Sequence, residues 1–336
     1  MTIQVGFLGA GEIARVHAAA LATVKGARLA TVADTTFDRA YALASKFGAK
    51  AFPDLETMLA TGGLDVIYIL TPPEGHARQI KAIAARGLPI MCEKPLTVTL
   101  SEADQALAAC RQACVPLMTG LSHRYHPLAR RAKELLLSGD LGDFVAAWSH
   151  RLVHLPIAPK SWLNDVSVGG GLTLQYAMHD LDWLCWLGGE VAQLSAQEVH
   201  TNPELNIEDN LWALLQFQNG GSGNVGVSWS VPSAWTERGL IGSRGNLRIV
   251  EQKRLLGRLA NGRQLEEDLG QDYDWFDVFV RENTDIVQRV QQGLPFAISG
   301  EDGRRALMIS LAVQEAAQTG QLISLPKGRE TSVEII

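Results

Sequence analysis

The sequence has little cysteine, with four in 336 residues: Cys92, Cys110, Cys114 and Cys185. Their spacing matches no common zinc motif, and so few thiols in a chain of this length do not indicate a disulfide framework. We therefore expect buried free thiols and no metal site.

Long apolar runs and long basic runs are also absent. The longest apolar runs, such as VIYIL at 66–70, are far too short to span a bilayer, and no charged segment precedes an apolar stretch at the N-terminus. We expect a cytoplasmic protein without membrane contact. The formal net charge is −6, and the densest basic cluster, RYHPLARRAK at 124–133, is typical of a solvated helix face. Nucleic acid is therefore not an expected partner.

The hydrophobic content of 46% is ordinary for a globular protein, and 336 residues exceed what one core usually organises. The first third alternates short apolar runs with helical patterns. We expect strands over 3–8, 27–33, 64–70 and 89–92, and helices over 13–24, 37–47, 74–86 and 102–113. Strands that are apolar throughout, each followed by a helix, predict a doubly wound parallel sheet, the Rossmann architecture, over residues 1–121.

Extended segments separated by Gly, Asn and Pro turns dominate residues 144–250. They predict a second α/β domain, over 122–336, built on a large, open and mostly antiparallel sheet. Two helical patterns near the C-terminus, 275–292 and 301–319, are expected to cover a face of that sheet. The sequence has no internal repeat and no low-complexity linker, so the boundary near residue 121 depends on the change of pattern alone.

A glycine-rich turn follows the first expected strand and contains Gly9, Ala10, Gly11, Glu12, Ile13 and Ala14. In such a turn the first glycine permits the tight bend, the second lets a pyrophosphate approach the backbone, and the small last residue lets the helix pack closely on the sheet. The phosphates then meet the amide groups and the positive end of the helix dipole. Glycine turns alone are common; the position between strand and helix predicts dinucleotide binding.

Asp34 ends the second expected strand, about 20 residues beyond the glycine-rich turn. A carboxylate there accepts hydrogen bonds from the adenosine ribose hydroxyls, and it repels a 2′-phosphate by about 1 kcal/mol or more at close range. NAD is therefore favoured over NADP. Alternatively, Asp34 only caps a turn, and the nearby Arg39 would moderate the preference for NAD.

The sequence Glu93-Lys94-Pro95 follows the apolar strand at 89–92. Ligands of open α/β sheets bind beyond the carboxyl ends of the strands, which is where Lys94 stands. A lysine there can hold a substrate oxygen by a charged hydrogen bond, or exchange protons when it is desolvated. Taken alone, the same three residues are also typical of a surface turn.

The stretch GGGLTLQYAMHDLD, at 169–182, leads three glycines into an apolar helical pattern that carries Gln175 and His179. Residues at i and i+4 lie on one helix face, so an amide and an imidazole are placed side by side. His179 is therefore a candidate acid/base group. The alternative is an internally hydrogen-bonded core histidine.

Together with TPPEGH (71–76), GLSHRYHP (120–127), SGDLGDF (138–144) and GSRGNLRI (242–249), these motifs occur in an order that resembles the Gfo/Idh/MocA family of sugar and cyclitol oxidoreductases. The likeness extends over nearly the whole chain. It implies a Rossmann domain, a C-terminal α/β domain on a large open sheet, and an active site between them. The residues predicted to lie at the cofactor beyond the glycine-rich turn and Asp34 are Thr71, Pro72, His76, Glu93 and Lys94.

The resemblance also implies roles for single residues. In that family the lysine matching Lys94 contacts the substrate, and the histidine matching His179 is the usual acid/base. The family commonly has an aspartate four residues before this histidine, where this sequence has Gln175. A glutamine orients the imidazole without stabilising its cation by charge, so we expect His179 to protonate less readily than beside an aspartate.

Members of the family often pair through exposed sheet faces, which implies a homodimer or homotetramer formed through the C-terminal sheet. A bare sheet face would otherwise be an exposed apolar patch.

Further substrate contacts are predicted in the segment after the last Rossmann strand and in the segment before the triple glycine. Aromatic and basic side chains suit a polyhydroxylated or anionic small molecule, by stacking and by charge. The predicted contacts, beside Lys94 and His179, are His123, Arg124, Tyr125, His154, Trp162 and Gln175. Arg124 and Trp162 are alternatively structural.

The hypothesis is an NAD-dependent oxidoreductase that acts on a secondary alcohol of a sugar, sugar derivative or cyclitol. His179 removes the hydroxyl proton, Lys94 stabilises the developing alkoxide, and hydride passes to the cofactor. Two alternatives stay open. One is a redox-neutral, NAD-dependent enzyme that cleaves glycosides, which the presence of Gln175 allows. The other is a non-catalytic sugar sensor that binds dinucleotide, against which the presence of both Lys94 and His179 speaks.

Overall fold

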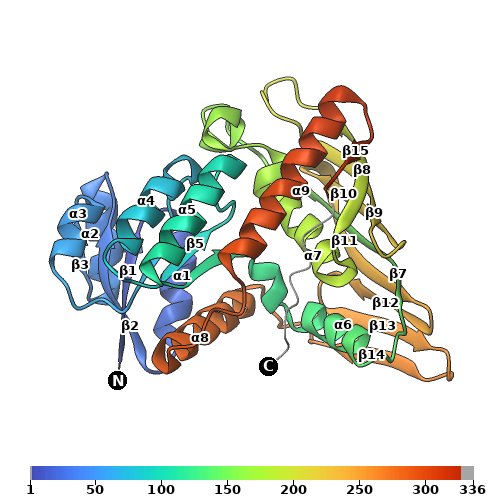
Figure 1. Ribbon diagram of the computed structural model, residues 1–336, viewed down its shortest axis with the longest axis horizontal. Helices are drawn as coiled ribbons and strands as arrows, with labels where there is room; N and C mark the ends of the chain where they lie inside the picture. The colour runs from blue at the N-terminus through green and yellow to red at the C-terminus, as the bar shows by residue number, and fades with distance from the viewer. Residues whose placement is uncertain (1, 327–336) are drawn as a thin grey trace. The chain divides into compact units, whose positions relative to one another are not determined.

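A computed structural model describes residues 2–326 of the chain (Figure 1). These residues form two compact units. The first unit runs to His126 and also takes in Ser167–Gly169 and Tyr273–Met308. The second comprises Pro127–Val166, Gly170–Asp272 and residues 309–326. Each unit is built on a sheet of its own.

The sheet of the first unit has six parallel strands in the order β3-β2-β1-β4-β5-β6. The strand order reverses between β1 and β4, which is where doubly wound sheets bind their ligands. Strand β4 is buried along its whole length, as expected for a parallel strand covered on both faces. The strands are β1 Ile3–Leu8, β2 Ala27–Ala33, β3 Lys50–Phe52, β4 Val66–Ile69, β5 Ile90–Glu93 and β6 Leu117–Gly120.

The helices of the first unit are α1 Glu12–Thr23, α2 Phe37–Phe47, α3 Leu55–Ala60, α4 His76–Ala84, α5 Leu100–Ala113 and α8 Phe276–Gln292. Short 3₁₀ turns, η1 Pro73–Gly75 and η2 Ser122–Tyr125, follow β4 and β6. Helix α4 packs against α5, and α1 packs against α8. Because crossovers are right-handed, α1 and α4, which leave the two strands at the reversal, lie on opposite faces of the sheet.

Helix α8 corrects one prediction. Residues 275–292 were expected to cover the large sheet of the C-terminal domain, but α8 packs on α1 of the first unit. Its last turn is tied there by Gln291, whose Nε2 donates to the carbonyl of Gly26 at 3.2 Å. An amphipathic pattern shows that a helix buries one face, and it does not show which sheet or helix that face meets.

The sheet of the second unit has nine strands in the order β14-β13-β12-β11-β7-β10-β9-β8-β15. Neighbouring strands are antiparallel except β7 and β10, which run parallel. This confirms the predicted fold class, a Rossmann sheet with a large, mostly antiparallel second sheet. The strands are β7 Phe144–His154, β8 Val191–Val199, β9 Asn210–Phe217, β10 Ser222–Ser228, β11 Ser230–Gly242, β12 Gly245–Val250, β13 Arg254–Leu259, β14 Gln264–Asp268 and β15 Ile323–Ser324.

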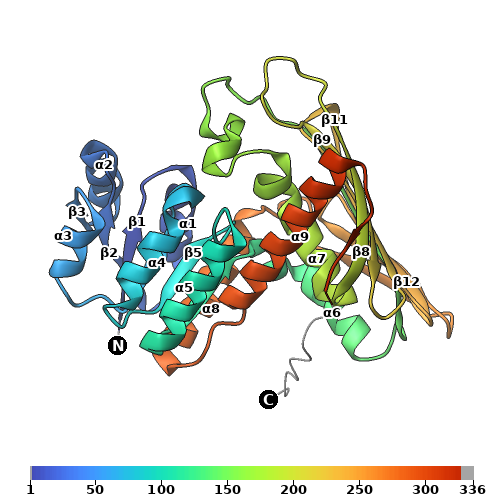
Figure 2. The ribbon, with the colours of Figure 1, turned by 45° about the horizontal axis from the view of Figure 1, so that its top comes forward.

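The remaining helices are α6 Pro127–Leu137, η3 Trp162–Asn164, η4 Val166–Val168, the π-helix η5 Thr173–Ala177, α7 Met178–Gly188 and α9 Gly300–Thr319. Helix α7 packs on β7 and β10, and α6 contacts β12. Figure 2 shows α7 on one side of this second sheet. Strand β9 shows the resulting alternation, because Leu211, Ala213 and Leu215 are buried while Trp212 and Leu214 are exposed. One face of this sheet is therefore core, and the other carries exposed apolar side chains.

Within residues 2–326, no helix combines the length and the apolar composition that crossing a membrane requires. The cysteines are free thiols, but only three of them are buried. The prediction is wrong for Cys114, which is exposed because it forms the left-handed C-cap that ends α5 at the surface.

Candidate functional site

The glycine-rich turn stands at the carboxyl end of β1 and opens α1. Gly9 has a φ of +103°, and a Cβ there would lie 2.6 Å from the carbonyl oxygen of Leu70, so only glycine fits this bend. Gly11 is the N-cap of α1, and a Cβ on it would meet no atom within 4 Å. Open space above a helix N-terminus, with its unpaired amide groups, fits a dinucleotide pyrophosphate.

Asp34 lies next to this turn and caps it. Its Oδ2 accepts from the backbone N–H of Ala10 at 2.9 Å, and its Oδ1 accepts from that of Thr36 at 2.8 Å. Each carboxylate oxygen has two lone pairs, so each keeps one for a ribose hydroxyl. The two interpretations of Asp34, a turn cap and a ribose ligand, are therefore compatible.

His76 ties the loops after β4 and β5 together. The ring is fully buried, with Nε2 at 2.8 Å from the carbonyl of Thr71 and Nδ1 at 3.0 Å from that of Pro95. Burial lowers the pKa of His76, which favours the neutral ring, and a neutral ring donates to one of these two carbonyls. Thr71 is held in turn by its hydroxyl, which donates to Gln79 Oε1 at 2.7 Å. The cofactor contacts of Thr71, Pro72 and His76 stay predictions.

Lys94 follows β5 directly, and the Lys94–Pro95 peptide bond is cis. In the sheet order, β5 is separated from β1 by β4 alone, so Lys94 and the glycine-rich turn share one edge of the sheet. Glu93 is buried, with Oε1 at 3.1 Å from His17 Nε2 and Oε2 accepting from the Lys94 N–H at 3.1 Å. The cofactor contact predicted for Glu93 stays a prediction.

The turn η2 after β6 carries His123, Arg124 and Tyr125, and all three are buried. Arg124 pairs with Asp302, Nη1 to Oδ1 at 3.1 Å, and the Tyr125 hydroxyl donates to Asp285 Oδ2 at 2.8 Å. The interpretation of this segment as a solvated helix face is therefore wrong for Arg124, because its buried guanidinium pairs with the partly buried carboxylate of Asp302. The substrate contacts of these three residues stay predictions.

In the second unit, two carboxyl groups meet where η5 begins. Glu208 Oε1 accepts from the Thr173 N–H at 2.8 Å, and the Thr173 hydroxyl lies 3.5 Å from Glu198 Oε1. The last of the three glycines, Gly171, has a φ of +99°, and a Cβ there would lie 3.2 Å from a carboxylate oxygen of Glu208. A glycine at this position thus allows the bend and leaves room for the Glu208 carboxylate, which accepts from the first residue of η5.

Gln175 and His179 span the junction between η5 and α7, and both are buried. The backbone changes here from i→i+5 to i→i+4 hydrogen bonding, so the α-helical spacing assumed from the sequence applies only from Met178 onwards. Single π-helical turns are rare and occur frequently at functional sites.

Asp180, the residue after His179, is fully buried and held by two arginines. Its Oδ2 accepts from Arg151 Nη2 at 2.8 Å, and its Oδ1 accepts from Arg238 Nη2 at 2.9 Å and from the Ser149 hydroxyl at 2.7 Å. Burial alone would raise the pKa of Asp180, but the charges of the two arginines lower it below its ordinary value. We call this group, Ser149, Arg151, Asp180 and Arg238, the Asp180 clamp.

The Asp180 clamp also holds the π-helix. Arg151 Nη2 donates to the carbonyl of Tyr176 at 2.7 Å, and its guanidinium lies 3.4 Å from the centre of the Tyr176 ring. The residues that follow Gln175 and His179 are thereby fixed to β7. Sequence reasoning missed the clamp, although one signal was present: Ser149 and Arg151 stand two apart in a strand, on its inward face, where polar side chains need buried partners.

The segment before the triple glycine leaves two predicted substrate contacts exposed. His154 is exposed at the end of β7, and Trp162 in η3 is 41% exposed. Asn164, close by, is buried, and its Oδ1 accepts from the Asn206 N–H at 2.7 Å. Among the described residues, no three His, Cys, Asp or Glu side chains are grouped as a metal site.

The pair at the start of η5 gives a pH prediction. Burial, and then the charge of Glu208, raise the pKa of Glu198 from 4.5 to about 7. A carboxyl group whose pKa rises on folding contributes stability at low pH, and this contribution is lost as the pH increases from about 4.5 to about 7. Glu198→Gln should therefore show a smaller fall in Tm between pH 5 and pH 8 than the parent. Equal falls in thermal unfolding experiments would contradict this.

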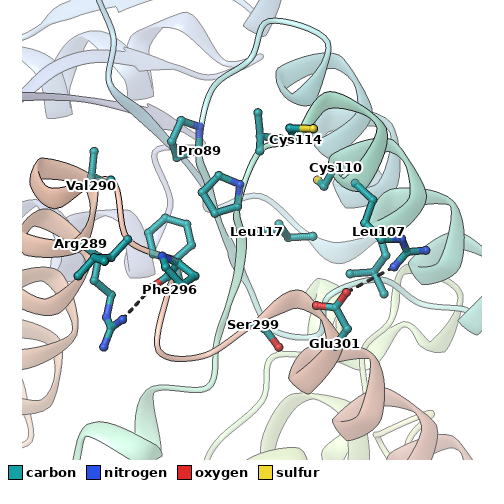
Figure 3. A pocket seen from close by; sticks show the side chains of 16 residues that line it. Pro89, Leu107, Cys110, Cys114, Leu117, Arg289, Val290, Phe296, Ser299 and Glu301 are labelled. Atoms are coloured by element: carbon teal, nitrogen blue, oxygen red, sulfur yellow. Dashed lines mark hydrogen bonds and ion pairs between the residues drawn. The ribbon is translucent and has the colours of Figure 1, made fainter. Parts of the chain in front are cut away.

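A cavity of about 510 Å³ in the first unit lies away from this edge. Pro89 and Pro116, which line it, directly precede β5 and β6, so it opens at the amino ends of the strands. Figure 3 shows the Leu107, Leu117, Phe296 and Glu301 side chains around it. Arg111, which also lines it, pairs with Glu301 at 3.4 Å. This largely apolar cavity is not the site that the motifs predict.

Two family models match the sequence. One, described as an oxidoreductase family with an NAD-binding Rossmann fold, matches residues 3–121, and the other, the GFO/IDH/MocA C-terminal domain, matches residues 129–248. The chain belongs to the Gfo/Idh/MocA family of oxidoreductases. The resemblance drawn from the motifs is thus confirmed. The first match contains the glycine-rich turn, Asp34 and Lys94, and the second contains Gln175 and His179.

Relatives within the Gfo/Idh/MocA family match almost end to end. Myo-inositol 2-dehydrogenase of Thermotoga maritima is 24% identical, over 96% of this chain and 98% of that protein. D-xylose 1-dehydrogenase (NADP(+)) 2 of Haloferax volcanii is 26% identical, over 88% and 91%. A solved levoglucosan dehydrogenase, in complex with NADH and levoglucosan, shares the fold with a TM-score of 0.90 at 20% identity, covering 97% and 100% of the chains. The names of these relatives carry both cofactors, NADP and NADH, so likeness alone does not choose between them.

Proposed function

We propose that the protein is an NAD-dependent dehydrogenase that interconverts a secondary alcohol of a sugar, sugar derivative or cyclitol and the corresponding ketone. One observation carries the proposal: the glycine-rich turn, Asp34 and Lys94 stand at the carboxyl edge of one parallel sheet. Doubly wound sheets bind dinucleotides at that edge, and Lys94 adds a cation there. The relatives' substrates, such as myo-inositol and D-xylose, are polyhydroxylated molecules.

The chain's own residues would divide the work. NAD, when bound, supplies the hydride acceptor. His179 acts as the general base for the hydroxyl proton, and Lys94 holds the oxygen on which negative charge develops. The Asp180 clamp keeps the backbone at His179 in one position, because two buried guanidinium groups hold the neighbouring carboxylate. Gln175 contributes an amide without a charge.

The first test is to incubate the protein with NAD and a panel of myo-inositol, D-xylose, levoglucosan and aryl glycosides. Net formation of NADH, measured by its absorbance, supports the proposal. Release of the aglycone without net NADH would replace it with redox-neutral glycoside cleavage. Binding of a panel member without any turnover would replace it with a sensor.

The cofactor preference gives a prediction of its own. Asp34→Asn removes the negative charge and keeps one side-chain oxygen as a hydrogen-bond acceptor. It should therefore lower the ratio of the NADPH dissociation constant to the NADH dissociation constant by about tenfold, or about 1.4 kcal/mol. Both constants can be measured by titrating nucleotide fluorescence. The matched control is Asp38→Asn, an exposed carboxylate in the first turn of α2. A parent protein that binds NADPH more tightly than NADH would overturn the preference for NAD.

We also propose that the exposed face of the nine-stranded sheet pairs two copies of the chain. Trp212 and Leu214 on β9 and Trp235 on β11 lie on this face, 42%, 60% and 44% exposed. Trp212 stands opposite Gly226, where a Cβ would lie 2.3 Å from the indole, so the ring lies flat over the neighbouring strand. A flat and exposed apolar patch of this kind typically marks a protein–protein contact.

Trp212→Glu should therefore convert the parent oligomer to a smaller species, because a charge placed in the centre of an apolar contact loses its hydration. Leu137→Glu is the matched control, since Leu137 is 70% exposed on α6 and not on this sheet face. Light scattering after gel filtration gives both masses. A monomeric parent, or a Trp212→Glu variant with the parent mass, would contradict the proposal.

A further inference from the structure

His17 is a fully buried residue of α1 for which the sequence indicated no role in catalysis. Its Nε2 lies 3.1 Å from Glu93 Oε1, and its Nδ1 lies 3.1 Å from Asn283 Nδ2. Asn283 Nδ2 also donates to the carbonyl of Phe279 at 2.8 Å, which identifies this end of the amide as the donor. His17 Nδ1 therefore accepts a hydrogen bond, and the ring proton on Nε2 is donated to Glu93.

Glu93 connects His17 to the backbone of Lys94. One carboxylate oxygen accepts from His17, and the other accepts from the backbone N–H of Lys94 at 3.1 Å. The carboxylate thus bridges the α1 side chain and the peptide group from which Lys94 starts. A change in the Glu93 rotamer would free that peptide group to rotate.

The other end of the segment is held independently. His76 Nδ1 lies 3.0 Å from the carbonyl of Pro95, so buried histidines of α1 and α4 flank Lys94 on both sides. Lys94 itself is only partly buried.

The surroundings of His17 leave it few alternatives. Tyr68 and Phe279 present their rings nearly perpendicular to the imidazole, with centroids at 5.8 and 5.3 Å. Glu282 of α8 is fully buried, and neither of its carboxyl oxygens has a hydrogen-bond partner among the described residues. Burial, and then the charge of Glu93, raise the pKa of Glu282 well above its ordinary value, so Glu282 stays neutral. The hydrogen bond from His17 Nε2 is accepted by Glu93.

We propose that His17 is a positioning residue, whose neutral imidazole sets the orientation of Lys94 through the carboxylate of Glu93. The kinetic consequence rests on the catalytic role proposed above for Lys94, whereas the structural consequence does not. A histidine that only fills space in the core would have no directed effect on Lys94.

Two similar variants separate these roles. In His17→Gln the amide nitrogen reaches about as far as Nε2, so it can still donate to Glu93. In His17→Asn the amide ends near the position of Nδ1 and does not reach Glu93. Both are polar and smaller than histidine, so a packing role predicts similar behaviour, and a positioning role predicts that only His17→Asn differs from the parent.

The structural readout needs no substrate. Each protein is treated briefly with acetic anhydride in the presence of NADH, and acetylation of Lys94 is compared with that of the exposed Lys50 by mass spectrometry. We expect the Lys94 to Lys50 ratio to change by about threefold or more in His17→Asn and to stay near the parent value in His17→Gln. Glu93→Gln leaves His17 in place and should change the Lys94 to Lys50 ratio as His17→Asn does. It replaces His17→Asn in the test if that variant does not fold. Unchanged ratios in whichever of these variants fold, or equal changes in His17→Gln and His17→Asn, would overturn the proposal.

The kinetic readout uses the panel compound with the largest turnover. His17→Asn should lower kcat by about 10- to 100-fold, and it should cost nothing more in a Lys94→Ala background. Additive losses would show that His17 does not act through Lys94. If Lys94→Ala leaves turnover unchanged, the proposed function of Lys94 fails, while the acetylation ratio still decides whether His17 positions it.

Discussion

Replacing His179 with alanine should lower kcat by about 10²- to 10⁴-fold, the range that a positioned general base contributes. Lys94→Ala should cost about 10²- to 10³-fold, because the oxygen that gains negative charge would lose its charged donor. His179→Ala should bind NADH with nearly the parent dissociation constant, because the glycine-rich turn, Asp34 and Lys94 are untouched. Lys94→Arg keeps the charge and alters its geometry, so it should recover little of the activity.

The measurement is steady-state turnover of the panel compound that the parent oxidises best. His200→Ala is the matched control for His179→Ala, because His200 is an exposed histidine that immediately follows β8. It should stay within about threefold of the parent, a difference too small for a lost general base. The proposed roles are wrong if His179→Ala and Lys94→Ala also stay within about threefold, and a double variant should lose less than the product of the single losses if the two groups act on one step.

Replacing Asp180 with alanine should lower the free energy of unfolding by about 3–5 kcal/mol, the cost of removing one partner from a buried ion pair. The substitution would leave Arg151 and Arg238 facing each other in the interior without a counter-charge, since the Asp180 carboxylate holds both. It would also release the turn that carries His179. We therefore expect reduced stability together with a lower kcat.

Chemical denaturation gives the stability change. Asp104→Ala is the matched control, because Asp104 also pairs with an arginine, Arg304, at an exposed position. Exposed ion pairs contribute about 0–1 kcal/mol, so the two aspartates should differ clearly. The lowered pKa of Asp180 also predicts how stability depends on pH. The stabilising contribution of Asp180 is present above its ordinary pKa of 3.8 and is lost as the pH falls below that value. Similar losses for both variants would show that the Asp180 clamp is not a stabilising contact.

Much of the fold followed from local pattern. The apolar strands at the centre of the first sheet, β1 and β4, and the alternating β9 were predicted because burial on two faces or on one leaves a continuous or a period-two pattern. Strand β3 and helix α3 were missed, since three and six residues are too few for either period to appear. Strands β13 and β14 extend the second sheet beyond the segment in which strands were expected.

The candidate site was predictable where one turn carries the chemistry. The bend at Gly9 needs a glycine, and the space beside Gly11 is open, as the glycine-rich turn predicts. Lys94 stands at a strand end, as its context predicts. The π-helix at Thr173–Ala177 was not predictable, because its residues also suit an α-helix and the clamp on Tyr176 and Asp180 comes from other strands.

The sequence by itself determined the turns and the strand ends, since these depend on residues within a few positions of one another. It also determined the family, because the order of such local motifs along the chain identifies it. Tertiary structure alone decided that α8 packs on α1, and that His17 meets Asn283 across a separation of 266 residues. The physical reason is that a buried polar group must find a partner, while its own neighbourhood in the chain does not specify which distant segment supplies it.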